Sequence, residues 1–155
     1  MALLRDTARR LGRTRLFAAV GRRIAPPIDL AVSRLTGGRR TFAGLLLPTL
    51  VLVHRGSRSG REYRTPVSYV ADGDRFYLAA TNWGQRSHPA WSANLMANPG
   101  AEVVVDGEVV PVRARRLSEE EKEEVWPRFV EMWPAYASYR SRTSRNVRLF
   151  VLERR

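Results

Sequence analysis

The chain of 155 residues lacks cysteine entirely and has only two histidines, His54 and His88. Without cysteine there is no disulfide scaffold, no catalytic thiol, no thiolate metal site and no iron–sulfur cluster. Two histidines are also too few for a metal site built from several of them. These absences exclude the common cysteine- and histidine-based centres, and we expect no bound metal.

Long apolar runs are lacking as well. The longest, residues 44–53, is too short to span a bilayer and contains Pro48. Arg39–Arg40 stand before it as in a twin-arginine signal, but they lie deep in the chain and no small-residue cleavage site follows. We therefore expect a cytoplasmic protein, with peripheral contact to the inner face of the cell membrane as an open alternative.

Positive charge is in excess, with a formal net charge of +12. Residues 1–40 hold ten arginines against Asp6 and Asp29, which is +8 of that +12. A chain this basic meets nucleic acid, an anionic membrane surface or an anionic small molecule. No nucleic-acid reading motif is present, so a basic nucleic-acid-binding module is the weaker alternative.

Residues 1–40 form the first expected unit, a basic helical arm. Apolar residues recur at helical spacing over residues 2–24, which predicts one or two amphipathic helices. Pro26–Pro27 is expected to stop this pattern, and a second short helix over residues 28–35 ends at Gly37–Gly38. The arm either packs on the body with a solvated arginine face or docks on an anionic membrane, and both interpretations stay open.

Residues 41–155 form the second expected unit, where the apolar period becomes that of strands. Turn signals at Asp72–Asp74 and Asp106–Gly107 join neighbouring strands into hairpins. The expected strands cover residues 46–54, 62–70, 75–80, 101–105, 108–117 and 146–153. About six hairpin-linked strands predict an α+β fold, mainly β, in which an antiparallel sheet closes into a small barrel.

Three helices are expected between these strands, over residues 88–97, 119–131 and 133–142. The first has Ser87 or His88 as its candidate cap. The second opens with an S-x-x-E capping box at Ser118–Glu121.

The turn between the first two expected strands, within Val51–Val67, is rich in arginine. Its glycines, Gly56 and Gly60, supply backbone freedom, and its serines can close local hydrogen bonds. A turn does not need the four arginines threaded through it, Arg55, Arg58, Arg61 and Arg64. Because guanidinium groups bind phosphate and carboxylate in bidentate fashion, this turn is interpreted as a receptor for an anionic group.

Catalytic acid–base pairs are hard to find in this sequence. No serine lies in G-x-S-x-G, and no G-x-G-x-x-G follows a strand. His54 ends a strand, where a structural role is the better interpretation, and His88 at a helix start suits capping or ligand contact. A chain so poor in such pairs is expected to take its chemistry from a cofactor.

Several segments, in order, resemble the deazaflavin (coenzyme F-420)-dependent nitroreductases of the split β-barrel flavin/deazaflavin oxidoreductase superfamily. They are G-S-R-S-G (Gly56–Gly60), R-T-P-V (Arg64–Val67), A-A-T (Ala79–Thr81), H-P-A-W-S-A-N-L (His88–Leu95) and W-P-x-Y-x-x-Y (Trp133–Tyr139). The likeness covers about residues 40–153. It implies a split β-barrel and hydride transfer from reduced coenzyme F-420 to a quinone, a nitroaromatic or an activated alkene.

The resemblance also implies where the cofactor lies. Its anionic phospholactyl and oligoglutamate tail falls on the turn, at Ser57, Arg58, Ser59, Gly60 and Arg64. Its ring is lined by Thr65, Pro66, Val67, Ala79, Ala80 and Thr81, by Ser87, His88, Pro89, Ala90 and Trp91 at a helix start, and by Tyr136. Trp133, Tyr136 and Tyr139 face the acceptor, Trp83 lies at the substrate mouth, and Thr81 or Tyr136 is the candidate proton donor.

Other interpretations stay open at this point. An FMN-binding oxidase or reductase of the same barrel superfamily is the nearest alternative. The three-residue spacing of Trp133, Tyr136 and Tyr139 equally suits a helix that packs inward as core. Asn82 stands where one member type of the family has a lysine, so the resemblance does not settle the substrate class. The oligomeric state is expected to be a monomer or a homodimer.

Overall fold

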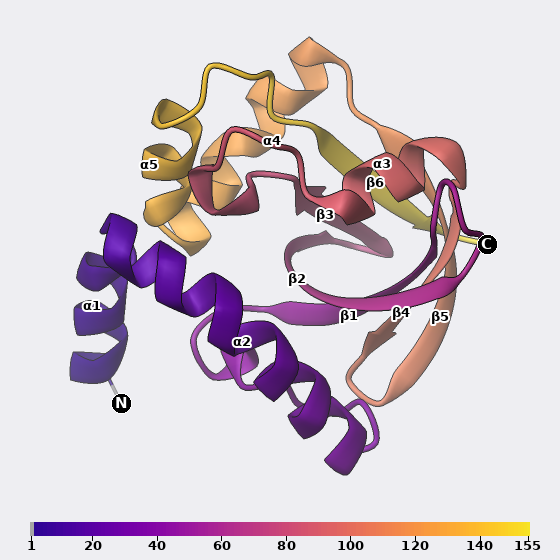
Figure 1. Ribbon diagram of the computed structural model, residues 1–155, viewed down its shortest axis with the longest axis horizontal. Helices are drawn as coiled ribbons and strands as arrows, with labels where there is room; N and C mark the ends of the chain where they lie inside the picture. The colour runs from indigo at the N-terminus through magenta and orange to yellow at the C-terminus, as the bar shows by residue number, and fades with distance from the viewer. Residues whose placement is uncertain (1) are drawn as a thin grey trace.

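The computed structural model describes the backbone of residues 2–155 and the side chains of residues 6–155 (Figure 1). Its strands are β1 (Thr49–Arg55), β2 (Glu62–Asp72), β3 (Arg75–Ala79), β4 (Gly100–Val105), β5 (Glu108–Arg116) and β6 (Leu149–Arg154). Its α-helices are α1 (Ala2–Leu11), α2 (Arg15–Leu35), α3 (Ala90–Ala97), α4 (Glu119–Met132) and α5 (Ala135–Ser141). Two short 3-10 helices are η1 (Ala43–Leu45) and η2 (Asn82–Gly84).

The strands close into a barrel in the order β1-β2-β3-β6-β5-β4, with antiparallel pairing between neighbours. Both expected hairpin turns are present, with Gly73 and Asp106–Gly107 at the positive φ that tight turns require. The last strand, β6, completes the barrel by pairing with β3 on one side and β5 on the other. The fold class expected from the sequence, a small antiparallel barrel with inserted helices, is confirmed.

The barrel wall separates two apolar cores, one inside it and one between it and the helices. On β6, Phe150 and Leu152 belong to the inner core, whereas Leu149 and Val151 belong to the outer one. All four are at most 1% exposed, so this strand is buried on both faces and is apolar along its length. The helices α4 and α5 cover the outer core, where Phe129 is fully buried (Figure 1).

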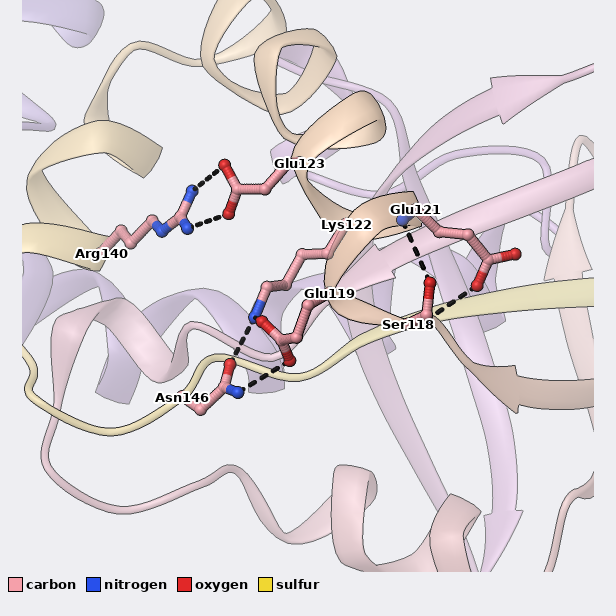
Figure 2. A network of polar contacts seen from close by, with 7 residues as sticks. All are labelled: Ser118, Glu119, Glu121, Lys122, Glu123, Arg140 and Asn146. Atoms are coloured by element: carbon pink, nitrogen blue, oxygen red, sulfur yellow. Dashed lines mark hydrogen bonds and ion pairs between the residues drawn. The ribbon is translucent and has the colours of Figure 1, made fainter.

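The helix α4 begins as the sequence predicts and is tied to α5 (Figure 2). The Glu121 N–H donates to Ser118 Oγ at 3.2 Å, and the Ser118 N–H donates to Glu121 Oε2 at 2.8 Å, which completes the capping box. Glu123 on α4 forms an ion pair with Arg140 on α5. The capping box thus sets where α4 begins, and the ion pair joins the two helices that cover the outer core.

The single lysine holds the loop that precedes β6 against α4 (Figure 2). Lys122 is only 5% exposed and contacts Glu119 Oε2 at 2.5 Å. It also donates to Asn146 Oδ1, and Asn146 Nδ2 donates to Glu119 Oε1 at 2.8 Å. The buried charge is therefore paired and hydrogen-bonded, and it anchors the segment around Asn146.

The arm differs from the prediction at Pro26–Pro27, because α2 runs through both prolines for 21 residues. Each proline removes a hydrogen bond to the carbonyl four residues earlier. Those carbonyls belong to Arg22 and Arg23, which are exposed and leave them open to water. The carboxylate of the buried Asp29 accepts from the Ala43 N–H at 2.7 Å and ties α2 to the next segment. Tertiary contact thus overrides the local stop signal.

The arm packs against the body of the molecule (Figure 1). The two glycines that weaken its helical pattern are contact points: Gly12 lies against the ring of Trp133, and Gly21 against Trp83. A Cβ on Gly12 would come within 2.5 Å of Trp133 Cζ2. The predicted stop at Gly37–Gly38 is present, both with positive φ. Across the described residues, no helix is long and apolar enough to cross a membrane.

Candidate functional site

A cavity of about 880 Å³ opens between α2, the β1–β2 turn, α3 and α5. Its volume lies within the range of sites for cofactors and drug-sized ligands, roughly 300 to 1,000 Å³. Its wall is made by segments from the arm, the barrel and the C-terminal helices. The arm is therefore one side of this cavity rather than an appendage.

Most of the residues that the resemblance assigned to cofactor or acceptor line this cavity. They are Ser57, Arg58, Ser59, Thr65, Pro66, Val67, Ala79, Thr81, Trp83, His88, Pro89, Ala90, Trp91, Trp133, Tyr136 and Tyr139. The assigned residues outside the lining are Gly60, Arg64, Ala80 and Ser87. Segments far apart in the sequence thus meet at one place.

The β1–β2 turn is closed by its own hydrogen bonds. The Gly56 N–H donates to Arg61 O at 2.8 Å, and the Gly60 N–H donates to Gly56 O at 2.9 Å. Gly60 has φ +65°, which explains the glycine there. These two N–H groups are occupied, whereas the N–H groups of Arg58 and Ser59 have no partner among the described residues, so side chains and backbone of these two residues are available to an anion.

The four turn arginines do not act together. Arg64 pairs with Glu62 at 3.4 Å and is not among the residues that line the cavity, and Arg55 donates to Gly60 O at 3.4 Å. Arg58 alone of the four lines the cavity, and it has no hydrogen-bond or ion-pair partner among the described residues. It is therefore the turn cation available to a ligand.

A buried polar chain that the sequence did not reveal anchors this turn to α3. The Ser57 N–H donates to Asn94 Oδ1 at 2.8 Å, and Asn94 Nδ2 donates to His54 Nδ1 at 3.1 Å. The other ring nitrogen, His54 Nε2, therefore carries the proton and donates to Thr65 Oγ1 at 2.9 Å. His54 is 3% exposed, and burial lowers the pKa of its imidazole to about 4. The structural role expected for His54 is thus specific: it orients Asn94 and Thr65.

The start of α3 differs from the expectation. The N-cap is Pro89, with no side-chain cap, so neither Ser87 nor His88 caps the helix. The carbonyl of Ser87 accepts from Asn82 Nδ2 at 2.9 Å. His88 turns instead toward Arg145, whose Nη1 lies 3.0 Å from His88 Nδ1. A proline with fixed φ begins the helix without help from its neighbours.

The loop after β3 carries backbone strain at the cavity wall. Asn82 and Trp83 have φ of 49° and 58°, and Gly84 follows at 79°. Positive φ is uncommon for a side chain as bulky as that of Trp83 and marks functional sites more often than chance. Just before them, Thr81 is 5% exposed, and its hydroxyl has no hydrogen-bond partner among the described residues. That hydroxyl remains available to a ligand.

Trp133, between α4 and α5, and the two tyrosines of α5 belong to both the outer core and the cavity wall. Trp133, Tyr136 and Tyr139 are each at most 6% exposed, and all line the cavity. Burial and the neighbouring Tyr139 raise the pKa of Tyr136, so its phenol stays protonated. The core interpretation and the pocket interpretation of this spacing therefore both hold.

The apolar end of the cavity includes arm residues for which the sequence suggested no site role. Phe17, Val20 and Ile24 line it from α2, and the ring of Phe17 lies 6.5 Å from that of Trp133. Their helical spacing was visible in the sequence, but nothing local indicates which face turns toward the barrel. The cavity is therefore cationic and polar at the turn and mainly aromatic and aliphatic at α2 and α5, although α2 also contributes Arg22 and the buried Asp29 to the lining. That division fits a flat ring with an anionic tail, and an apolar acceptor beside it.

Barrel and cavity together define an oxidoreductase of the split-barrel flavin/deazaflavin class. A sequence profile of the F420H(2)-dependent quinone reductase family matches residues 28–154. The Mycobacterium tuberculosis protein Rv3178, named for the same family, is 33% identical over 109 residues, which are 70% of this chain and 92% of the relative. The chain therefore belongs to the F420H(2)-dependent quinone reductase family.

Solved structures agree. A structure described as an F420-H2 dependent reductase (FDR-A) has a TM-score of 0.64 and 33% identity, and covers 68% of this chain and 94% of its own. Another, described as a domain-swapped dimer, has a TM-score of 0.66 and 30% identity, and covers 80% of this chain and 95% of its own. The expectation of an F-420-dependent oxidoreductase, rather than an FMN protein, is confirmed by the family.

Proposed function

We propose that this protein reduces quinones with reduced coenzyme F-420 and that nitroaromatics and activated alkenes are further acceptors. The observation that carries this is the division of one cavity into a cationic end at Arg58 and an aromatic end at Trp133 and Tyr139. A single cavity with these two ends suits a deazaflavin with a charged tail and an apolar acceptor stacked on it.

The residues then have distinct roles. Ser57, Arg58 and Ser59 hold the anionic tail, whereas Gly60 and Arg64 of the same motifs lie outside the cavity lining. Thr65–Val67, Ala79 and Thr81, together with the start of α3, line the ring, whereas Ala80 lies in the inner core. Bound reduced F-420 supplies the hydride, and the protein contributes position and exclusion of water.

Two hydroxyl groups at the acceptor side of the cavity can donate hydrogen bonds. Trp83, Trp133 and Tyr139 form its wall. Tyr136, kept protonated by burial, and the free hydroxyl of Thr81 are hydrogen-bond donors for a developing negative charge on the acceptor oxygen. The raised pKa of Tyr136 makes it a better hydrogen-bond donor than proton source, and water or Thr81 is left to relay the proton.

The test is to mix the protein with reduced F-420 and menadione without oxygen. Oxidation of the cofactor is measured as the return of deazaflavin absorbance. We expect turnover with menadione, and slower turnover with a nitroaromatic. FMN offered in parallel is expected to bind weakly. Tight FMN binding with no effect on deazaflavin fluorescence would overturn the proposal, and binding without turnover would leave a cofactor carrier.

We further propose that the arm contacts an anionic membrane, where lipophilic quinones reside. Large apolar side chains on and after α2 are exposed, among them Leu16 at 75%, Leu35 at 87% and Leu45 at 55%, and arginines lie between them. Liposomes with anionic lipid are expected to pellet the protein, and Leu16→Asp with Leu35→Asp to pellet less. Equal pelleting of the two proteins would remove this proposal.

A further inference from the structure

Arg145, in the loop between α5 and β6, lies outside every motif that the sequence suggested. Its guanidinium makes three hydrogen bonds, all to the segment that joins β3 to α3. Nη2 donates to Thr81 O at 2.7 Å, Nη1 donates to His88 Nδ1 at 3.0 Å, and Nε donates to Gln85 O at 3.1 Å. Thr81 and His88 line the large cavity, whereas Arg145 does not. Arg145 therefore holds two cavity-lining residues by hydrogen bonds without lining the cavity itself.

The contact with Arg145 sets the tautomer of His88. A guanidinium only donates, so His88 Nδ1 accepts and the ring proton of the neutral imidazole lies on Nε2. Nε2 has no hydrogen-bond partner among the described residues, and none of their buried side-chain nitrogens or oxygens is left unpaired. The Nε2–H is therefore accessible, at a residue that lines the cavity.

Burial and nearby cations lower the pKa of His88, which favours the neutral imidazole. Burial is the largest cause that lowers its pKa, followed by Arg148, Arg145 and Arg116, which lie on or near β5 and β6. All three charged groups that shift the pKa of His88 are arginines, and each of them lowers it. A neutral imidazole with its proton on Nε2 donates one hydrogen bond to a carbonyl or to a negatively charged oxygen.

Arg145 also braces the strained loop. The carbonyl of Thr81 accepts from Arg145 and, at 3.0 Å, from the Gly84 N–H across the residues with positive φ. The arginine is itself placed by the network next to it, where Asn146 is held by Lys122 and Glu119 (Figure 2). The position of Trp83 at the cavity thus depends on a residue over 60 positions later in the chain.

We propose that Arg145 is a positioning residue of the cofactor site. It holds His88 with its Nε2–H toward the cavity, where His88 donates to a carbonyl or anionic oxygen of the bound ligand, and it holds the loop that carries Trp83. The identity of that ligand as F-420 rests on the proposed function, whereas the tautomer and the brace do not.

Nitrogen-15 NMR of the two imidazoles tests the inference without cofactor. The wild type is expected to show the Nε2–H tautomer at His88. Arg145→Gln should shift His88 toward a mixture of tautomers and raise its pKa. The matched control Arg148→Gln removes a neighbouring cation and should raise the pKa while the tautomer stays. His54 should keep its signals in both variants, which checks the fold. An unchanged His88 tautomer in Arg145→Gln would overturn the inference.

Fluorescence titration with F-420 tests the consequence. Arg145→Gln is expected to weaken binding about tenfold, the usual effect of losing one hydrogen bond to a ligand. Arg145→Lys keeps the charge but lacks the three-way fork, so it should restore binding only in part. Full restoration by lysine would contradict a geometric role. If no variant and no wild type binds F-420, the proposed function fails, and the NMR result alone decides the role of Arg145.

Discussion

At the scale of single residues, Asn94 holds the arginine-rich turn in place at the cavity wall. Its side chain joins the Ser57 N–H to His54 Nδ1 and so connects the turn, α3 and β1. An amide is suited to this place because it accepts on one side and donates on the other.

Replacing Asn94 separates these two contacts. Asn94→Ala leaves the Ser57 N–H and the His54 ring without partners, so we expect a loss of about 1–3 kcal/mol in the free energy of unfolding and weaker F-420 binding. Asn94→Asp keeps the acceptor for Ser57 but loses the donor to His54, so F-420 affinity should stay closer to that of the wild type. Denaturant unfolding measures the free energy of unfolding of each variant, and F-420 titration measures its affinity. Equal affinity losses in the two variants would contradict the anchoring role of the Ser57 contact.

His54 makes stability depend on pH. Its folded-state pKa of about 4 lies below the ordinary value of 6.5, so the unfolded chain takes up the proton more readily. The contribution of neutral His54 to the free energy of unfolding is fully present above pH 6.5. It is lost as the pH falls from 6.5 towards 4, and the total loss is roughly 3 kcal/mol. We expect His54→Gln to flatten this part of the stability profile. An NMR titration of the wild type that places the pKa of His54 near 6.5 would contradict the account.

At the scale of elements, the arm contacts the C-terminal helical region where the ring of Trp133 packs on Gly12. Gly12 is the first residue after α1 and its N–H donates to Ala8 O at 2.8 Å, so helix propensity favours alanine over glycine there by at most about 1 kcal/mol. At Gly12 the added Cβ would press on the rigid ring of Trp133 at 2.5 Å. The two effects oppose each other, and the contact is expected to win because the ring has no space to move.

Gly12→Ala is therefore expected to destabilise the protein by about 1–3 kcal/mol, as overpacking of a core does. In a Trp133→Leu background the same change should be neutral or stabilising. Thermal or denaturant unfolding of the four proteins measures this coupling. A stabilising Gly12→Ala in the wild-type background would show that the arm is not packed as described.

At the scale of the whole molecule, the positions of the strands, both hairpin turns and the start of α4 follow from alternation, turn residues and the capping box at Ser118, whereas the place of β6 between β3 and β5 does not. The continuation of α2 through Pro26–Pro27 does not, because the contacts that stabilise it come from Asp29 and the segment after the helix. We propose that residues 1–40 and 41–155 are an arm and a barrel unit, with a cavity that both of them line.

The candidate site was predictable where residues lie in contiguous motifs, as in the turn and at the start of α3. His54, Asn94 and Arg145 escaped detection as site residues because their roles arise from contacts between segments 37 to 64 positions apart. Arg64 fits the motif yet pairs with Glu62 on the same strand, which residue type alone does not reveal. Local sequence patterns do not show which side chains form hydrogen bonds between distant segments.

Fluorescence titration of F-420 tests the central claim most directly, with wild type, Arg58→Ala and the control Arg128→Ala. Arg128 pairs with Asp72 and donates to Ala71 O, outside the cavity lining. We predict saturable quenching by the wild type and the control, and at least about tenfold weaker binding by Arg58→Ala, since a charged hydrogen bond contributes about 1.5–3 kcal/mol. Saturable binding with equal affinity in all three proteins would contradict the tail site, and no quenching by the wild type would contradict the account as a whole.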